Sequence, residues 1–221
     1  MFFHAERVLV IAPHTDDECI GCGGLIARFR ELGTEVRVVC LSPAMESIPM
    51  GFPMNATMNE FKDALKVLDA EGVCHTMEAR KFSQHEQGIL DLLRPLREDH
   101  YDLVIGPSVH DEHRDHTITA LETLRAFWDV AVLSYEIPKR CPDFRPLVWV
   151  PLSHEDMMQK VRALECYKSQ QIKKNFSGVS DVILGNARTR GIQIGVEYAE
   201  AFEVPRSMIL SPRGPSSILR C

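Results

Sequence analysis

The chain has 221 residues, a formal net charge of −6 and a hydrophobic content of 45%. This composition predicts a globular protein with a sizeable core, and an acidic balance without a long basic run argues against a nucleic-acid or anionic-membrane surface. No stretch approaches the ~20 apolar residues of a membrane-spanning helix, and the polar start MFFHAER is unlike a secretory signal. Seven scattered cysteines indicate free thiols in a reducing, cytoplasmic compartment rather than a disulfide framework.

Strand and helix patterns alternate along the chain, which predicts an α/β fold: a Rossmann-like three-layer domain with a mainly parallel sheet and helices on both faces. The expected strands are 7–12, 35–41, 73–78, 102–106, 130–137, 147–152 and 199–204. The expected helices are 21–32, 60–71, 87–100 with a break near Pro95, 117–128, 154–167 and 182–192. We expect one domain over residues 1–221, with a poorly ordered tail from residue 211 and pocket-lining loops at 42–57 and 138–146.

Polar residues directly follow two of the buried strands. His14, Asp16 and Asp17 come after VLVIA, and the stretch HDEHRDH (110–116) follows DLVIG. Because ligands bind at the carboxyl ends of parallel strands, we expect the two clusters to face each other. Imidazoles and carboxylates together form the ligand set of a catalytic zinc site with an open position. Each cluster alone has a structural alternative. His14 could be a loop histidine hydrogen-bonded to the backbone, and Asp16 and Asp17 could cap the following helix.

The segment after the first cluster contains a CxxC pair, Cys19 and Cys22, which a redox site or a zinc site could use. No second CxxC is present, and we favour a packing role in which Gly21, Gly23 and Gly24 let the helix approach the sheet closely. The glycines also form an incomplete dinucleotide-binding pattern, but three neighbouring acids would repel a pyrophosphate.

Two motifs resemble those of the PIG-L/LmbE-like family of metal-dependent amide deacetylases. PHTDDE (13–18) is similar to the family's AHPDDE, and HRDH (113–116) is similar to its HPDH. CIGCGGLIARF and YAEAFEV extend the similarity over residues 8–204. Thr15 and Arg114 replace prolines that bind no metal in the family. Members that act on sugars often carry an arginine at the start of the helix expected near Glu60, where this chain reads NATMNEFK, so the substrate stays open.

The resemblance implies a role for each matching residue. His14, Asp17 and His116 match the metal ligands, Asp16 the general base, and His113 the histidine that, protonated, stabilises the oxyanion. The metal would be zinc, with ferrous iron as the alternative, and it would activate water for attack on the amide.

Two further residues of the motifs are assigned no catalytic role. We expect Glu18 to be structural, and His110 to lie at the rim of the site rather than to bind metal. The family implies a small-molecule partner, an N-acetylglucosamine-type glycoside, conjugate or nucleotide sugar, and an enzyme that can form homo-oligomers. The alternatives are a non-catalytic metal or sugar-nucleotide binding module, and a metal-dependent hydrolase of an ester or phosphoester.

Overall fold

The computed structural model describes residues 5–173 and 178–207, so the tail expected from residue 211 lies outside the described residues. One seven-stranded sheet with the order β3-β2-β1-β4-β5-β7-β6 forms the centre of the fold. The strands are β1 (Arg7–His14), β2 (Glu35–Ser42), β3 (Glu71–Cys74), β4 (Leu103–Pro107), β5 (Ala131–Tyr135), β6 (Val148–Leu152) and β7 (Tyr198–Arg206). The pairings among β1 to β5 are parallel, and β7 runs antiparallel to both β5 and β6.

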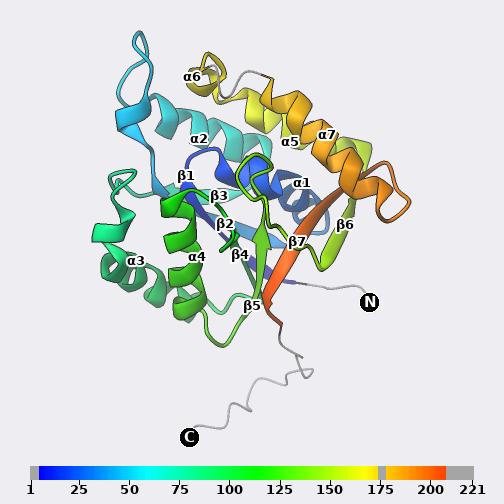
Figure 1. Cartoon of the computed structure of the whole chain (residues 1–221), viewed down its shortest axis with the longest axis horizontal. Coiled ribbons are helices and arrows are strands. Elements are labelled where there is room, and N and C mark those ends of the chain that lie inside the picture. The colour runs from blue at the N-terminus through cyan, green and yellow to red at the C-terminus, as the bar shows by residue number, and fades with distance from the viewer. Residues whose placement is uncertain (1–4, 174–177, 208–221) are drawn as a thin grey trace, which may run out of the picture.

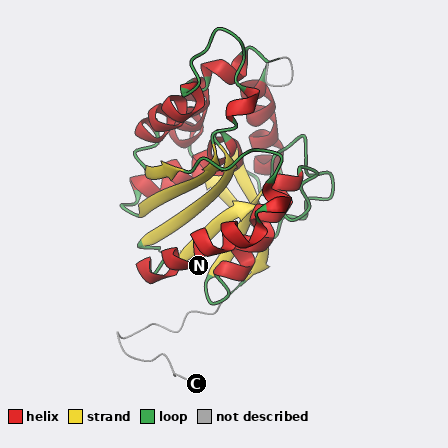
Figure 2. Ribbon diagram, turned by 90° about the vertical axis from the view of Figure 1, so that its left-hand side faces the viewer, coloured by secondary structure: helices red, strands yellow, loops and turns green. Residues whose placement is uncertain are grey.

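Helices cover both faces of this sheet, which gives the three layers seen edge-on in Figure 2. The helices are α1 (Asp17–Glu31), α2 (Ala56–Val67), α3 (Glu86–Leu93), α4 (Arg114–Ala126), α5 (His154–Glu165), α6 (Lys168–Gln171) and α7 (Val179–Ile192). Helices α1, α2, α5 and α7 pack into one apolar core and α3 and α4 into a second, as their separate positions in Figure 1 show. The predicted α/β architecture is confirmed. No helix of the described residues is long and apolar enough to cross a membrane.

Several element boundaries differ from the sequence predictions. Helix α2 lies about one turn earlier than expected, because Asp69 adopts a left-handed backbone (φ 52°) that ends the helix before the edge strand β3. The α-helix of the expected segment 87–100 ends at Leu93, and residues Arg94–Asp99 form a 3-10 helix, since Pro95 cannot donate an α-helical hydrogen bond.

The two strands followed by polar clusters, β1 and β4, are neighbours in the middle of the sheet. The chain leaves β1 toward β2 on one side and leaves β4 toward β5 on the other. The carboxyl ends of β1 and β4 therefore form the topological switch point, where open α/β sheets bind their ligands.

Helix α1 lies close against the sheet because its first turns carry glycines. A Cβ atom on Gly21 would lie 2.2 Å from the buried Tyr135 ring, and one on Gly24 would lie 2.4 Å from Leu152. The buried Glu200 side chain of β7 accepts hydrogen bonds from the backbone amides of Gly24 and Leu25 and pairs with Lys160 of α5. The predicted packing role of the glycines is confirmed.

The variant Gly21→Ala is expected to lower the free energy of unfolding by about 2 kcal/mol, because its methyl group would overlap the Tyr135 ring. Urea denaturation followed by circular dichroism measures this. The matched control is Gly88→Ala in α3, where a Cβ atom meets nothing within 4 Å, and there the helix should gain about 0.5–1 kcal/mol. Equal effects of the two substitutions would contradict the close packing of α1.

Candidate metal centre and active-site cleft

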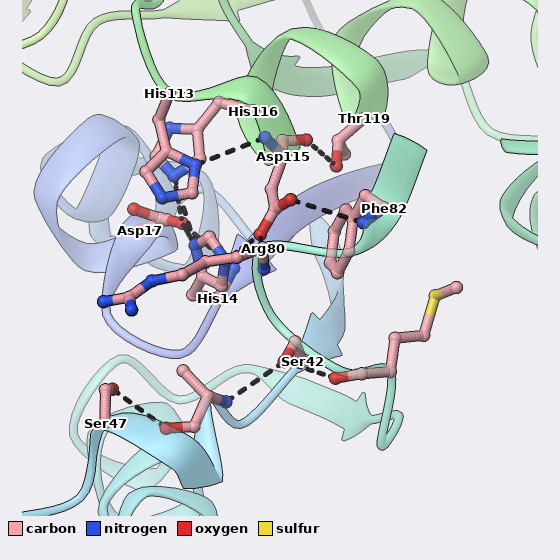
Figure 3. Close-up of polar contacts among 12 residues, drawn as sticks. His14, Asp17, Ser42, Ser47, Arg80, Phe82, His113, Asp115, His116 and Thr119 are labelled. Atoms are coloured by element: carbon pink, nitrogen blue, oxygen red, sulfur yellow. Dashed lines mark hydrogen bonds and ion pairs between the residues drawn. The ribbon is translucent and has the colours of Figure 1, made fainter. Parts of the chain in front are cut away.

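Three side chains from three elements converge at the carboxyl ends of β1 and β4. His14 is the last residue of β1, Asp17 the first residue of α1, and His116 lies in the first turn of α4. Figure 3 shows the three pointing toward one another. The expectation that the two polar clusters face each other is confirmed.

The donor atoms of this triad form a nearly equilateral triangle. His14 Nδ1 lies 3.2 Å from His116 Nε2 and 3.3 Å from Asp17 Oδ2, and His116 Nε2 lies 3.2 Å from the same carboxylate oxygen. Ligand atoms about 2.0–2.1 Å from a tetrahedral zinc ion are separated by about 3.3–3.4 Å. These side chains could therefore hold a metal ion with little rearrangement, with one coordination position left open.

Two buried carboxylates fix which ring nitrogens carry protons. Asp115 Oδ2 lies 3.0 Å from His14 Nε2, and Asp111 Oδ2 lies 2.8 Å from His116 Nδ1. In its neutral form, each ring donates its N–H outward to an acid and directs its lone pair inward. Two imidazole lone pairs and a carboxylate oxygen then converge within 3.3 Å. A cation bound between them reduces the electrostatic repulsion among these three atoms.

The electrostatics of the triad favour positive charge. Burial opposes a charged His116 ring, but the Asp17 charge and the hydrogen bond to Asp111 outweigh burial and raise the pKa of His116 to about 10. Burial likewise opposes the charge on Asp17, yet the charge of His116 and hydrogen bonds from both histidines hold the pKa of this carboxyl far below its usual range. A metal ion that binds here displaces a proton.

Asp16 lies next to the triad in an unusual backbone conformation. Its φ of 94° is in the left-handed region, and although Asp16 is the N-cap residue of α1, its side chain makes no capping hydrogen bond. The capping alternative for this residue is therefore wrong. The half-buried carboxyl lines the cleft, where burial and the charges of Asp17 and Glu18 raise its pKa well above the usual range.

His113 caps helix α4 through its ring, since His113 Nδ1 accepts a hydrogen bond from the Asp115 amide at 3.2 Å. Burial and the positive charges of His116, His14 and Arg140 lower the pKa of His113 to about 4. A pKa this low favours a neutral ring in the free protein, and the hydrogen bond to Nδ1 places the ring proton on Nε2. The resemblance implies a protonated ring, which stays a prediction.

The remaining motif residues have structural contacts. His110 pairs with Glu203 at 2.8 Å and does not line the cleft, so it is no rival ligand. Buried Glu18 accepts a hydrogen bond from Tyr167 at 2.5 Å, which ties the motif to the segment after α5. Cys19 and Cys22 are buried inside α1, where burial raises the pKa of both thiols, so the packing interpretation of the CxxC holds.

The triad opens into a cleft of about 190 Å³. Its wall includes Pro43 and Ser47 from the loop 42–57 and Lys139 from the loop 138–146. Thr57 in the first turn of α2 and Ile137 after β5 complete this part of the wall. Both loops were expected to contribute.

A group of cations that no sequence motif indicated also lines the cleft, namely Arg80, Lys139, Arg140 and Lys173. The arginine expected at the start of α2 is absent, but two arginines enter from other segments. Arg80 follows β3 and Arg140 follows β5, so both lie after parallel strands whose carboxyl ends share the edge that holds the triad. Chain position after a strand was the signal that could have identified them.

Comparison with known proteins shows the family to which the chain belongs. The model of the PIG-L family, described as GlcNAc-PI de-N-acetylase, matches residues 9–127. An uncharacterized deacetylase of Escherichia coli K12, YaiS, is 23% identical over 172 residues, which cover 74% of this chain and 91% of the relative. The chain belongs to the PIG-L family, a family of deacetylases.

Two solved structures illustrate the fold. N,N'-diacetylchitobiose deacetylase from Pyrococcus horikoshii superposes with a TM-score of 0.77 at 20% identity, covering 90% of this chain and 84% of its own. GalB, the 4-carboxy-2-hydroxymuconate hydratase of Pseudomonas putida KT2440, superposes with a TM-score of 0.78 at 18% identity, covering 95% of this chain and all of its own. At these identities the likeness extends to the fold alone, which carries both a deacetylase and a hydratase.

The triad is expected to bind one divalent ion per chain, and Asp111→Asn is expected to weaken zinc affinity about 10–100-fold, because the neutral amide holds the His116 tautomer less firmly. Competition with a chromogenic chelator measures the affinity. His116→Ala should abolish binding, whereas Asp91→Asn, at an exposed acid of α3, should leave it unchanged. A wild-type affinity in His116→Ala would exclude the triad as the binding site.

Proposed function

We propose that the protein is a metal-dependent N-deacetylase that hydrolyses the acetamide of an N-acetyl amino sugar, with His14, Asp17 and His116 as the ligands of Zn²⁺ or Fe²⁺. The observation that carries this proposal is Asp16. A carboxylate with no capping bond lines the cleft directly beside a triad that can bind metal, and metal binding alone would not require it.

The bound ion would supply Lewis acidity, which acidifies water and polarises a carbonyl. Asp16 takes the proton of the attacking water, and a dication at the triad would favour the ionised form of its carboxyl. Neutral His113 donates its Nε2–H to the oxygen that becomes negative in the tetrahedral transition state. Because the low pKa of His113 disfavours a second proton on its ring, Asp16 returns its proton to the leaving amine. Acetate and a free amino sugar are released.

The fixed partners of these groups support the proposed roles. The Asp115 amide holds His113 Nδ1 as an acceptor and so places the ring proton on Nε2. The same residue's carboxylate orients His14 from the other side. Asp115 of α4 thus contacts both the proposed metal ligand His14 and the proposed oxyanion donor His113, and it fixes the position of one ring relative to the other.

We further propose that the chain acts as one deacetylase domain in the cytoplasm on a small-molecule substrate. Six cysteines of the described residues are free thiols, which supports a reducing compartment. The PIG-L family match supports an N-acetylglucosamine-type substrate.

A second candidate function is hydration of an unsaturated carboxylic acid, the reaction type named for GalB. The observation that favours it is the set of cations in the cleft, which suits a substrate with several carboxylates. A hydratase would add water across a carbon–carbon double bond and release no acetate, so the two candidates differ in their products.

Acetate release from a panel of N-acetylglucosamine conjugates tests the proposal. Zinc- or iron-loaded wild type is expected to turn over at least one of them, and Asp16→Asn to lower kcat about 10²–10⁴-fold with metal content unchanged. His113→Ala should cost about 10²–10³-fold, the usual effect of losing one oxyanion donor. Glu46→Gln, at a cleft acid outside the triad, is the matched control. Undiminished turnover in Asp16→Asn would contradict the assigned base.

A further inference from the structure

Two cysteines lie opposite each other on neighbouring strands at one edge of the sheet. Cys40 of β2 pairs in parallel register with Cys74 of β3, and the described strands hold no other cysteine. Residues that pair across parallel strands point to the same face, and their Cα atoms are separated by about the strand spacing, 4.7–4.9 Å. This separation lies within the range of about 4.4–6.8 Å that a disulfide spans. The register therefore allows a bond between the two sulfur atoms.

Both cysteine side chains lie on the face of the sheet that α2 covers. Cys40 belongs to the apolar core that includes α2, and Cys74 packs against the same core. Gly72 shares this face, because a Cβ atom there would lie 2.5 Å from Leu65 of α2. Burial, and after it a hydrogen bond with Cys74, raise the pKa of the Cys40 thiol. The two sulfur atoms are thus neighbours, and both cysteines are free thiols in this structure.

The two thiols differ in their access to solvent. Cys40 is fully buried, whereas Cys74 is partly exposed on the edge strand. A reagent therefore needs to reach only Cys74, and Cys40 can react afterwards from inside the core. An accessible attacking thiol beside a second, resolving thiol is the arrangement of redox-responsive cysteine pairs.

The edge strand β3 leads directly into the wall of the cleft. Beyond its last residue, the amide of His75 donates to the carbonyl of Cys40 at 2.8 Å, and the amide of Met77 donates to the carbonyl of Leu41 at 3.0 Å. The hydroxyl of Ser42 donates to the carbonyl of Met77 at 2.5 Å, a contact drawn in Figure 3. The segment that follows β3 is therefore held against the end of β2.

This segment ends at the metal centre. Ala79 and Arg80 line the cleft. The Arg80 amide donates to Asp115 Oδ2 at 2.6 Å, and the same oxygen lies 3.0 Å from His14 Nε2. A bond that fixes β3 to β2 would therefore also restrict the motion of this part of the cleft wall.

From this arrangement we propose that Cys40 and Cys74 form a redox-active pair, which closes to a reversible disulfide on reaction with a small disulfide such as oxidised glutathione. The bond holds β3 and the segment 75–81 to β2. This modification site is separate from the metal triad, and it does not depend on the proposed function.

The reaction consists of two exchange steps. The Cys74 thiolate attacks one sulfur of the small disulfide, so that a mixed disulfide forms and one small thiolate leaves with the proton that Cys74 gave up. The Cys40 sulfur then attacks the Cys74 sulfur, and the second small thiolate leaves and takes the proton of Cys40. The two cysteines together lose two electrons and two protons, and the small disulfide is reduced to two thiols.

The bond is expected to be readily reduced again. The Cβ atoms of a disulfide lie about 3.5–4.5 Å apart, which is closer than the spacing of the strands, so β3 has to move slightly toward β2. Strained disulfides are the labile and regulatory ones. A pair that is open at rest and closes under oxidation suits the reducing compartment proposed for this chain.

Peptide mass spectrometry tests the pair directly. The full chain is incubated with oxidised glutathione, alkylated and digested with trypsin, which releases Cys40 in peptide 38–62 and Cys74 in peptide 67–80. We expect these two peptides to be linked, with two hydrogen atoms lost, at least about tenfold more often than any other two cysteine peptides. Dithiothreitol should separate them again. In concentrated urea the preference should disappear, because the fold then no longer aligns the two strands.

Single variants assign the order of the two steps. Cys40→Ala is expected to stop at the mixed disulfide of Cys74 with glutathione, whereas Cys74→Ala should leave the buried Cys40 unmodified. The matched control is Cys166→Ser, which removes a partly exposed thiol whose Sγ donates to the backbone carbonyl of Arg162. This variant should form the Cys40–Cys74 link as wild type does. The wild-type digest decides the question even if a variant does not fold.

Hydrogen exchange measures the effect on the cleft wall. Amides of residues 75–81 are expected to exchange about three- to tenfold more slowly in the oxidised chain, because the bond restricts local opening of the edge strand. Amides of β7 should exchange at the same rate in both states.

Three results would overturn the inference. Wild-type Cys74 that stays unmodified, stops at the glutathione adduct or links to another cysteine would exclude the pair. Equal linkage in urea and in the folded chain would show that the strand register does not direct the bond. Unchanged exchange over residues 75–81 in the oxidised chain would refute the effect on the cleft wall.

Discussion

The convergence of two imidazole lone pairs and one carboxylate oxygen is the constraint on which the rest of the site depends. The electron-rich donor atoms of His14, Asp17 and His116 lie within 3.3 Å of one another. Two buried acids on the far sides of the rings hold the two imidazoles in this orientation. Such an arrangement is stable only with a cation between the three atoms, whether a proton or a metal ion. The fold supplies the buried acids, and the acids determine the tautomers.

This constraint explains why the surrounding structure is tightly packed. Asp17 reaches the triad only if the first turn of α1 lies directly on the sheet, and Gly21 against Tyr135 permits this approach. Directly before this turn, Asp16 has a left-handed backbone conformation, and its side chain lines the cleft. Local backbone strain of this kind is typical of functional sites and requires stabilisation from neighbouring packing. Further along α1 the buried Glu200 fixes the helix, because its side chain accepts hydrogen bonds from the amides of Gly24 and Leu25.

Much of this could be predicted from the sequence, for identifiable reasons. The alternation of strands and helices follows from apolar patterning, and the two polar clusters follow from their position after buried strands, so their meeting at β1 and β4 was predictable. Helix ends were not, because neither the left-handed backbone of Asp69 nor a histidine ring as an N-cap follows from apolar patterning.

The charge state of the site was also beyond local sequence. The resemblance implies a protonated His113, whereas burial and three positive neighbours, which only the folded chain brings together, lower the pKa of this ring. The cationic cleft depends equally on topology. Arg80 and Arg140 are sixty positions apart and lie at opposite flanks of the sheet's centre. With no motif linking them, only the strand order places them around one metal centre.

The position of the metal itself is the most direct measurement. Crystals of the full chain soaked in zinc, with anomalous diffraction recorded on both sides of the zinc absorption edge, would locate the ion. The structure requires a peak within about 2.2 Å of His14 Nδ1, Asp17 Oδ2 and His116 Nε2, with Asp16 facing it and not bound to it. A strong peak elsewhere, or none at the triad in crystals that hold zinc, would show that the converging atoms are not a metal site.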